Sequence, residues 1–409
     1  MKANQTMLRK LKLHNYRTFL NAEFDFTDRH LVIGANNSGK TNLSSAIVFL
    51  GATARQDLTT AAAAWVPGGI LEMSNWYSKR EEMEFSCTCE LEFGAKPCEF
   101  TYDLVLERFP ARLASAPAPI GLRVVNEKLV LSGEGFNDVV LLDSDGHEAK
   151  LFDEIQHEQG QPAHAPSTPV PANATMLSKL YELETNRRAI LFRRFLFHWN
   201  YYCLSPSAIR TGFRTNQGVM PALSPSGDNL SSAIFQLKNL DEARYRNVID
   251  HTHIVEPDLE AINFFPAPDQ GAVPFVALRG RSSASWYGLS DGTLRCMGLG
   301  YIVERSALVT DAAGVPAVTV IEEPENGIYP GQLRRVFDLF EERAPASQFI
   351  FTTHSPYFID FFDARRESVT ILKRNKDRTQ INPAPPVRPE DQSPDRLTLA
   401  EQYALELVD

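Results

Sequence analysis

The chain has 409 residues and a formal net charge of −10 at pH 7, which is enough length for two or three domains with sizeable cores. No apolar run approaches the roughly 20 residues of a membrane span, and the first twenty residues lack the apolar core of a signal peptide. We therefore expect a cytoplasmic protein that does not contact a membrane. The negative net charge argues against a protein whose whole surface is basic and binds nucleic acid. A local basic groove remains compatible with it, because the electrostatic attraction of a ligand depends on the distribution of charge as well as on the total.

Alternating apolar residues between positions 7 and 33 predict strands, and the last of these strands leads into a glycine-bracketed turn. The turn fits the phosphate-binding pattern G-x-x-x-x-G-K-[ST] and opens a predicted helix. Such a turn aims backbone N–H groups at a helix N-terminus and so forms a concavity for anions. We predict that Lys40 reaches the outer phosphates of a nucleotide and that the Thr41 hydroxyl ligates Mg²⁺. The predicted nucleotide-binding residues here are Gly34, Asn36, Asn37, Ser38, Gly39, Lys40, Thr41 and Asn42.

Strands continue after the first helix, and two proline-rich stretches interrupt them. The stretches 110–120 and 159–175 carry three and four prolines, and both are predicted loops. Cys87, Cys89 and Cys98 have no matching cysteine or histidine pair at zinc spacing, so we expect buried free thiols. The predicted strand pairs are 85–93 with 100–105 and 122–125 with 139–142.

From position 176 to about 253 the apolar period becomes helical, which predicts an inserted helical segment. Arg187 and Arg194 lie seven residues apart, so one side of a helix would carry both, a candidate stripe for tracking nucleic-acid phosphates. Leu183 and Ile190 fall on the same side and suggest partial burial. The alternative is a solvated face whose arginines pair with nearby acids. The residues concerned are Arg187, Arg188, Arg193 and Arg194, with Glu182 and Glu184 as the acids.

The run 316–325 is an apolar strand that ends in acids, as in a Walker B motif. We predict that Glu322 holds Mg²⁺, directly or through a water, and that Glu323 positions and activates the attacking water. Taken alone this pattern is weak, because many strands end in solvated acids.

A second apolar strand, 349–353, ends at His354. Carboxyl ends of parallel strands share an edge where ligands bind, so we expect His354 to face the same nucleotide and to hydrogen-bond its γ-phosphate. A lone histidine at a strand end is more often structural. Its position one predicted helix (330–342) after the Walker B strand favours the functional interpretation.

The segment 288–293 precedes a helix that is predicted to run to about residue 308. Ser290 and Gly292 at such a helix N-terminus would form a second anion site. An ordinary Asp-Gly turn is the alternative, and this segment alone favours that alternative.

In this order the motifs resemble the ATP-binding-cassette head of the SMC/RecF/OLD group, and within it the small AAA-domain ATPases of bacterial phage-defence systems. The resemblance covers residues 7–145 and 259–375. It implies an α/β fold, a P-loop ABC-type ATPase head with a mixed N-terminal β lobe and a parallel α/β lobe, and ATP and Mg²⁺ as cofactors. The expected division is an N-terminal lobe 1–158, a linker 159–175, a helical insertion 176–258, a C-terminal lobe 259–380 and a tail 381–409.

The resemblance also implies that two heads pair head-to-tail around two ATP molecules. The signature motif, Leu289–Thr293, would then place Ser290 and Gly292 on the nucleotide of the partner, and Arg17 would approach the phosphates of its own head. The chain departs from its relatives in carrying Glu322 where many have Asp and Tyr329 where histidine is common. A Q-loop glutamine cannot be placed, so we expect slow turnover.

The sequence shows no sustained heptads, and the 55 residues after His354 are too few for an appended Toprim nuclease domain. We therefore expect any nuclease or toxin activity to reside in a separate effector protein. Two hypotheses remain: an ATP-switched sensor or scaffold for that effector in anti-phage defence, and a RecF-like clamp that binds DNA in repair. DNA-stimulated ATPase activity with salt-sensitive DNA affinity would favour the clamp. A transporter ATPase is a weaker third option.

Overall fold

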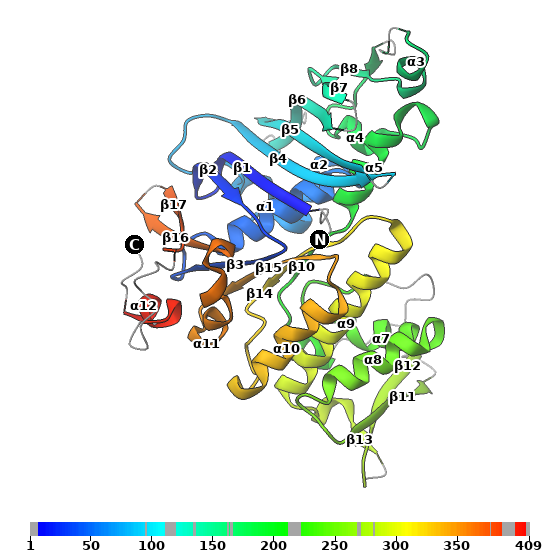
Figure 1. Ribbon diagram of the computed structural model, residues 1–409, viewed down its shortest axis with the longest axis vertical. Coiled ribbons are helices and arrows are strands. Elements are labelled where there is room, and N and C mark those ends of the chain that lie inside the picture. The colour runs from blue at the N-terminus through cyan, green and yellow to red at the C-terminus, as the bar shows by residue number, and fades with distance from the viewer. Residues whose placement is uncertain are drawn as a thin grey trace, which may run out of the picture. The chain divides into compact units, whose positions relative to one another are not determined.

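The computed structural model describes most of the chain, and its parts form two compact units. Unit 1 comprises Met1–Asn200, Ala313–Val318 and Glu367–Ala384, and unit 2 comprises Tyr201–Ala312, Thr319–Arg366 and Pro385–Asp409. Each unit is described by itself (Figure 1). The described residues are 7–94, 96–110, 120–133, 136–161, 163, 167–211, 222–267, 271–280, 283–376, 378–386 and 397–405.

Unit 1 contains an eight-stranded sheet in the order β2-β1-β4-β5-β6-β7-β8-β9. Its consecutive neighbours pair antiparallel, which confirms the predicted pairing of 85–93 with 100–105. The predicted pairing of 122–125 with 139–142 was wrong in register, because residues 139–142 lie opposite 129–131. The predicted loop 110–120 falls mainly outside the described residues. The strands are β1 Met7–Tyr16, β2 Phe19–Asp25, β4 Glu82–Phe93, β5 Lys96–Pro110, β6 Ile120–Gly133, β7 Phe136–Ser144, β8 Glu148–Leu151 and β9 Thr168–Pro169.

The core of unit 1 lies between this sheet and the helices α1 (Lys40–Thr53), α2 (Leu58–Trp65) and α5 (Arg187–Phe197). Apolar residues of β1 and β4 alternate with exposed ones, as a half-buried sheet requires. The ring of Phe85 lies 5.1 Å from that of Tyr16 and 5.4 Å from that of Phe49 on α1. The predicted burial of Cys87, Cys89 and Cys98 as free thiols is confirmed.

A second group of strands in unit 1 carries the glycine-bracketed turn. Strand β3 (Arg29–Gly34) is buried along its whole length and pairs in parallel with β16 (Val369–Asn375). Strand β17 (Arg378–Pro383) pairs antiparallel with β16. A strand buried on both faces reads as a continuous apolar run, which is how Leu31–Ile33 was recognisable in the sequence.

Unit 2 contains β14 (Val318–Glu322) and β15 (Gln348–Thr353) as neighbours in a sheet, joined by α10 (Pro330–Arg343). The predicted helix 330–342 is confirmed, and its proline stands at the first turn, where the missing N–H costs nothing. Phe337 and Phe340 of α10 pack on Phe351 of β15, with ring centroids 5.8 and 5.2 Å apart. This aromatic packing holds the ends of the two strands in place.

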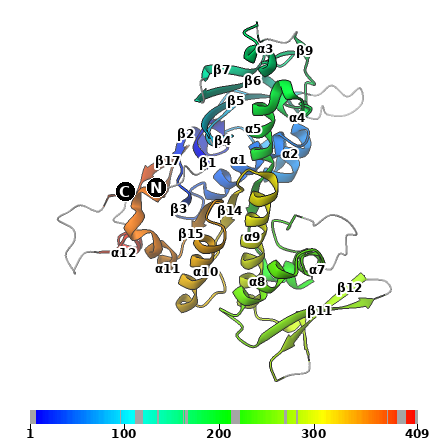
Figure 2. The same cartoon turned by 45° about the vertical axis from the view of Figure 1, so that its right-hand side comes forward.

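The rest of unit 2 is mainly helical, with a small sheet β11-β12-β13 beside α7 and α8 (Figure 2). The long helix α9 (Asp291–Ala313) starts at the signature motif, as predicted. No helix of the described residues is long and apolar enough to cross a membrane. The elements are α6 Pro206–Thr211, α7 Leu230–Leu240, α8 Glu242–Thr252, β11 Leu259–Ala267, β12 Gly271–Leu278, β13 Ala284–Ser285, η3 Trp286–Gly288, α11 Pro356–Ile359 and α12 Leu399–Ala404.

The predicted helical insertion is less uniform than its period suggested. A strand, β10 (Trp199–Tyr202), interrupts it. Leu183 precedes the helix that carries Ile190 and is 57% exposed, so its assignment to a buried helical side was wrong. The short elements of this region and of the unit boundaries are η1 Gly69–Glu72, α3 Glu154–Glu158, α4 Met176–Lys179, η2 Glu184–Asn186 and η4 Asp360–Ser368.

Candidate nucleotide-binding site

The turn between β3 and α1 in unit 1 has a conformation that requires glycine. Gly39 caps α1 with φ +112°, and a Cβ there would lie 2.9 Å from both Thr18 Oγ1 and Thr379 Oγ1. The Thr379 hydroxyl also donates to the carbonyl oxygen of Ser38 at 2.8 Å. The turn is therefore fixed by side chains from two distant segments as well as by its own sequence.

Lys40 and Ser38 give this turn the chemistry of an anion site. Lys40 is only 8% exposed, and its Nζ donates to the carbonyl oxygens of Gly34 at 2.7 Å and Ala35 at 3.2 Å. The Ser38 Oγ is buried and has no hydrogen-bond partner among the described residues. A buried ammonium at a helix N-terminus attracts an anion, and the unpaired Ser38 hydroxyl gains a partner when a phosphate group binds.

Arg17 lies beside the first turn of α1. Its Nε donates to Asn42 Oδ1 at 2.6 Å and its Nη1 to the carbonyl oxygen of Pro67 at 2.6 Å. Asn42 donates in turn to the Thr18 hydroxyl at 2.9 Å. Arg17 itself has φ +48°, a conformation that side-chain residues rarely adopt. These contacts bring the predicted residues Arg17 and Asn42 together within unit 1.

A pocket of about 430 Å³ opens beside this turn, within unit 1. It combines cationic side chains with two exposed aromatic residues, Trp76 (77% exposed) and Tyr77 (64%). The indole N–H of Trp76 donates to Glu72 Oε2 at 2.8 Å. Aromatic faces next to cations suit a nucleobase and its phosphates. The lining residues are Arg17, Thr18, Asn37, Asn42, Glu72, Trp76, Tyr77, Arg374 and Lys376.

Six of these lining residues were missed in the sequence, namely Trp76, Tyr77, Arg374, Lys376, Thr18 and Glu72. The adjacent aromatic pair in the otherwise polar stretch 74–80 was a visible signal for the first two. Arg374 and Lys376 stand at the turn between β16 and β17, more than 300 positions from the turn that they flank. Local spacing cannot reveal such a neighbour.

In unit 2 the two predicted acidic residues stand where β14 ends, at the start of a segment that we call the catalytic turn (Glu323–Ile328). Glu323 has φ +46°, a backbone conformation that costs on the order of 1–3 kcal/mol and is concentrated at functional sites. Its N–H donates to the carbonyl oxygen of Thr352 at 2.8 Å, and its Oε1 lies 4.0 Å from His354 Nε2. The structure therefore brings Glu323 and His354 together, as predicted from the neighbouring strand ends.

The surroundings of these acids include residues to which the sequence assigned no role. Burial and the nearby Glu322 carboxylate raise the pKa of the Tyr201 hydroxyl, which is hydrogen-bonded to Glu322. Glu322 keeps one carboxylate oxygen, Oε1, without a hydrogen-bond partner among the described residues, and carboxylate oxygens suit Mg²⁺. Glu325 is buried and accepts a hydrogen bond from the Thr353 hydroxyl, and burial raises its pKa.

The signature motif forms the N-terminus of α9, as expected. The Ser290 Oγ lies 2.7 Å from the Thr293 Oγ1 and accepts from the Thr293 N–H at 3.0 Å, which caps the helix. A Cβ at Gly292 would lie 2.5 Å from the carbonyl oxygen of Gly327, so this glycine permits a close backbone approach within its own unit. Arg210 of α6 donates to Asp291 Oδ1 at 2.6 Å.

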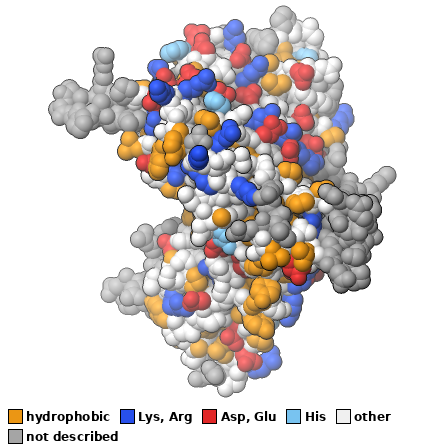
Figure 3. Space-filling view, turned by 90° about the vertical axis from the view of Figure 1, so that its left-hand side faces the viewer, with side chains coloured by type: hydrophobic (Ala, Val, Ile, Leu, Met, Phe, Trp, Pro, Cys, Tyr) orange, Lys and Arg blue, Asp and Glu red, His pale blue; other side chains and the backbone are white. Residues whose placement is uncertain are grey.

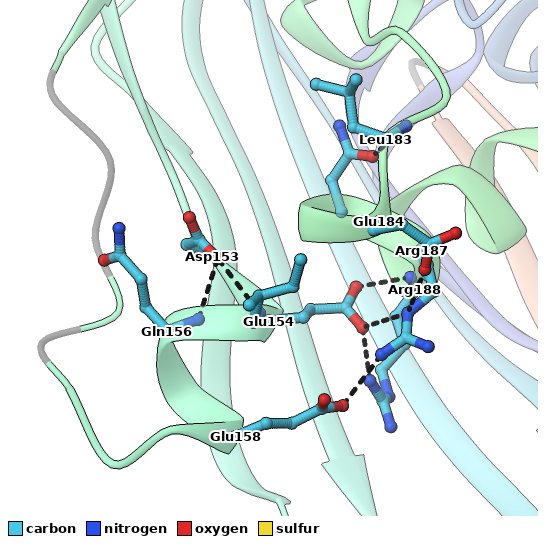
Figure 4. Close-up of polar contacts among 10 residues, drawn as sticks. Asp153, Glu154, Gln156, Glu158, Leu183, Glu184, Arg187 and Arg188 are labelled. Carbon is cyan, nitrogen blue, oxygen red and sulfur yellow. Dashed lines mark hydrogen bonds and ion pairs between the residues drawn. The ribbon is translucent and has the colours of Figure 1, made fainter.

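Three of the four arginines singled out in the insertion pair with acids, whereas Arg193 donates to the carbonyl oxygen of Leu180. This agrees with the solvated-face alternative for Arg187 and Arg194, but Arg188 is buried. Arg187 Nη2 lies 2.8 Å from Glu158 Oε1, and Arg188 forms an ion pair with the buried Glu154 (Figure 4). Arg194 lies 2.8 Å from Glu182. Figure 3 draws a different face, the left-hand side of Figure 1, and there too Lys and Arg side chains are interspersed with Asp and Glu side chains. These contacts provide no free cationic stripe on α5.

The predicted site residues thus fall into two groups. The P-loop residues and Arg17 lie in unit 1, whereas Glu322, Glu323, His354, Ser290 and Gly292 lie in unit 2. The roles that the sequence assigned to these residues stay predictions. The meeting of both groups on one triphosphate stays a prediction.

Comparison with known proteins gives two family-model matches and several similar structures. Residues 204–360 match the family "AAA domain, putative AbiEii toxin, Type IV TA system", and residues 7–99 match the family "AAA ATPase domain". No curated protein sequence matches the chain. An SMC head bound to the C-winged helix domain of ScpA aligns with a TM-score of 0.52 at 13% identity, covering 92% of this chain and 97% of the other.

Two further SMC heads align with lower scores. The head from Thermotoga maritima has a TM-score of 0.43 at 15% identity, covering 93% and 99% of the two chains. A head with an extended coiled coil, bound to the C-terminal domain of ScpA from Pyrococcus furiosus, has a TM-score of 0.49 at 11% identity and covers 98% of each chain. The likeness in fold is therefore drawn from the first of the three structures. Residues 7–99 and 204–360 thus match models of AAA ATPase domains, and the chain has the fold of an SMC-type ATPase head.

Proposed function

We propose that the protein binds and hydrolyses ATP with Mg²⁺ and acts as a switch, a sensor or scaffold for a separate effector protein in anti-phage defence. The observation that carries the ATPase part is the strained Glu323 beside His354, on the ends of two neighbouring strands. A carboxylate held in this way can position and deprotonate a water. The buried Lys40 supplies positive charge for the outer phosphates.

In this proposal each residue has one task. The P-loop N–H groups and Lys40 bind the phosphates, and Trp76 and Tyr77 hold the base. Thr41 and Glu322 would hold Mg²⁺, and the bound ion would neutralise charge on the phosphates. Glu323 takes the proton of the attacking water, and His354 donates a hydrogen bond to the γ-phosphate. Because phosphoryl transfer depends mostly on positioning and charge, this set of residues suffices for slow hydrolysis.

The proposed defence role is supported by a family-model match and by a relative of the same fold. The matching family model is described as a putative AbiEii toxin of a type IV toxin–antitoxin system, which associates domains of this kind with such systems. A head of the same fold was solved with a bound partner protein domain, which supports an effector that docks on the ATPase. The proposed resting unit pairs two heads through ATP, with Ser290 and Gly292 contacting the nucleotide of the partner.

Two measurements test the proposal. Purified protein should release phosphate from ATP in a Mg²⁺-dependent reaction that the Lys40→Ala variant lacks. Capture of the tagged protein from its native host should retain a nuclease or toxin subunit with ATP present. Absence of Mg²⁺-dependent phosphate release would refute the ATPase, and capture of no such subunit would refute the effector role.

The alternative function, a RecF-like DNA clamp, is disfavoured by the pairing of Arg187, Arg188 and Arg194 with acids. A clamp gains affinity by releasing counterions from DNA phosphates, which requires cations that are free to contact them. ATPase activity that rises on addition of duplex DNA, together with affinity that falls steeply with salt, would restore this alternative.

A further inference from the structure

Arg295 connects the signature motif with the catalytic turn inside unit 2. It lies on α9 one turn after Gly292 and is 9% exposed. Its Nη1 donates to the carbonyl oxygen of Glu323 at 3.0 Å, and its Nη2 donates to the carbonyl oxygen of Leu204 at 2.6 Å. The sequence assigned no role to this residue.

The carbonyl that Arg295 holds belongs to the residue with the strained backbone. The Glu323 carbonyl oxygen also accepts from the N–H of Asn326 at 3.2 Å, and its N–H is bound by Thr352. With φ at +46°, the Glu323 backbone stays in place only while its neighbours hold it there. Since the direction of a side chain follows its backbone, these bonds also set where the Glu323 carboxylate points.

A second contact joins the same two segments. Gly292 approaches the carbonyl oxygen of Gly327 so closely that even a methyl group would not fit. Gly292 and Arg295 lie three positions apart, so they share a face of α9. A shift of the helix N-terminus would therefore move the catalytic turn at two points, Glu323 and Gly327.

The start of α9 is itself held by residues 204–210 of unit 2. Arg210 donates to the carbonyl oxygen of Leu289 at 2.9 Å and to Asp291 Oδ1 at 2.6 Å. The indole N–H of Trp286 donates to the carbonyl oxygen of Ile209 at 3.2 Å. Arg295 binds the same segment at Leu204, so the signature motif and the catalytic turn share one support.

We propose that Arg295 is a positioning residue that couples the signature motif to Glu323 of the same head. Contact of Ser290 and Gly292 with the nucleotide of a partner head would fix α9, and Arg295 would transmit that position to the Glu323 carbonyl. Each head would then be set for hydrolysis of its own ATP only when its signature motif engages the partner. This inference rests on the proposed ATPase function.

A purely structural arginine would behave differently. Its removal would lower the stability of the fold, and nucleotide affinity and turnover would fall together with the folded fraction. Coupling predicts instead a loss confined to turnover, because the phosphate-binding residues lie in unit 1 and do not depend on Arg295. The two roles are separated by comparing kcat, KM and thermal unfolding.

The first test compares Arg295→Gln, Arg295→Lys and the control Arg246→Ala, whose arginine lies on the surface of α8 and pairs with Glu242. We expect Arg295→Gln to lower kcat at least tenfold, with KM for ATP and the midpoint of unfolding close to wild type. Arg295→Lys keeps a cation and should retain more turnover than Arg295→Gln, and the control should equal wild type. Unchanged kcat in Arg295→Gln would overturn the coupling, as would losses in Arg295→Gln and Arg295→Lys that match their folded fractions.

The second test mixes two variants with impaired turnover, Arg295→Gln and Glu323→Gln. If Arg295 acts within its own head, no mixed pair contains a competent head, so mixing should restore nothing. If it acts on the partner, the Arg295→Gln head keeps its Glu323 and borrows the intact Arg295, so activity should return and the proposal would fail. Wild-type protein without hydrolysis would refute the proposed function itself, whereas wild-type hydrolysis with an unimpaired Arg295→Gln refutes only the coupling.

Discussion

The Nε2 atom of His354 lies 4.0 Å from Oε1 of Glu323, and the two residues follow neighbouring strands of unit 2. The amide N–H of Asn326 donates to the Glu323 carbonyl, and the Asn326 side chain donates to the Glu323 carboxylate. Asn326 therefore holds both the backbone carbonyl and one carboxylate oxygen of Glu323, and His354 lies nearest the other carboxylate oxygen. This arrangement suits a group that takes a proton from a positioned water.

The Glu323→Gln substitution should abolish hydrolysis and leave ATP binding intact. A general base typically contributes about 10²–10⁴-fold to a rate, and glutamine keeps the shape of the side chain without the basic oxygen. We expect phosphate release to fall by at least about 100-fold, and the ATP-bound variant to accumulate as paired heads on size-exclusion chromatography. Glu342→Gln, at an exposed position of α10, is the matched control. Hydrolysis at the wild-type rate would show that the base lies elsewhere.

The Lys40→Ala substitution should remove nucleotide binding. Lys40 is buried beside the turn and provides charge-assisted bonds, each of which contributes about 1.5–3 kcal/mol. We expect the dissociation constant for ATP, measured by calorimetry, to rise by about 100-fold or more. Lys150→Ala removes an exposed lysine of the same unit and should leave binding unchanged. Equal affinity in Lys40→Ala and wild type would contradict the phosphate site.

The Trp76→Ala substitution tests the aromatic pocket. Stacking of a base on an aromatic ring contributes about 1–3 kcal/mol. The dissociation constant for ATP should therefore rise roughly 5- to 150-fold, with little change in kcat because the ring is remote from the reacting bond. Affinity for inorganic triphosphate, which has no base, should be unaffected. Tyr181→Ala is the control, since Tyr181 is an exposed aromatic residue outside the pocket. Equal losses for ATP and triphosphate would contradict stacking.

Glu127 should make the stability of the fold depend on pH. Its buried carboxylate accepts hydrogen bonds from the Tyr102 hydroxyl at 2.9 Å and from the N–H of Leu177 at 3.0 Å. Burial raises its pKa from 4.5 to about 7, against the effect of these donors. The folded state therefore binds the Glu127 proton more tightly than the unfolded state does. The contribution of this proton to the free energy of unfolding is complete below pH 4.5 and is lost as the pH rises through 7.

Urea unfolding of wild type and Glu127→Gln between pH 4.5 and 8 measures this effect. The wild type should lose roughly 3 kcal/mol relative to the variant over that range, since each pKa unit corresponds to about 1.4 kcal/mol. Other titrating groups, such as the buried His30, cancel in the comparison. Glu148→Gln, at an exposed position, should follow the wild type. Parallel curves for wild type and Glu127→Gln would contradict the raised pKa.

Much of the fold could be predicted because its signals are local. The run 31–33 before a glycine turn predicted β3 and α1, and the proline at 330 predicted the start of α10. The boundary errors have physical causes. Hairpin partners extend β6 and β7 beyond their apolar stretches, and Leu183 follows the helical period but lies before the helix.

The sequence by itself determined the order and chemistry of the motifs, since the spacing of Gly34, Gly39, Lys40 and Thr41, and the acids and histidine at strand ends, follow from local backbone geometry. Only the tertiary structure decided which residues from distant parts of the chain contact these motifs. It placed Arg374 and Lys376 beside Trp76, paired Arg187, Arg188 and Arg194 of α5 with acids, and set Arg295 on the carbonyl of Glu323. Those contacts join segments far apart in the chain, and residue spacing carries no information about them.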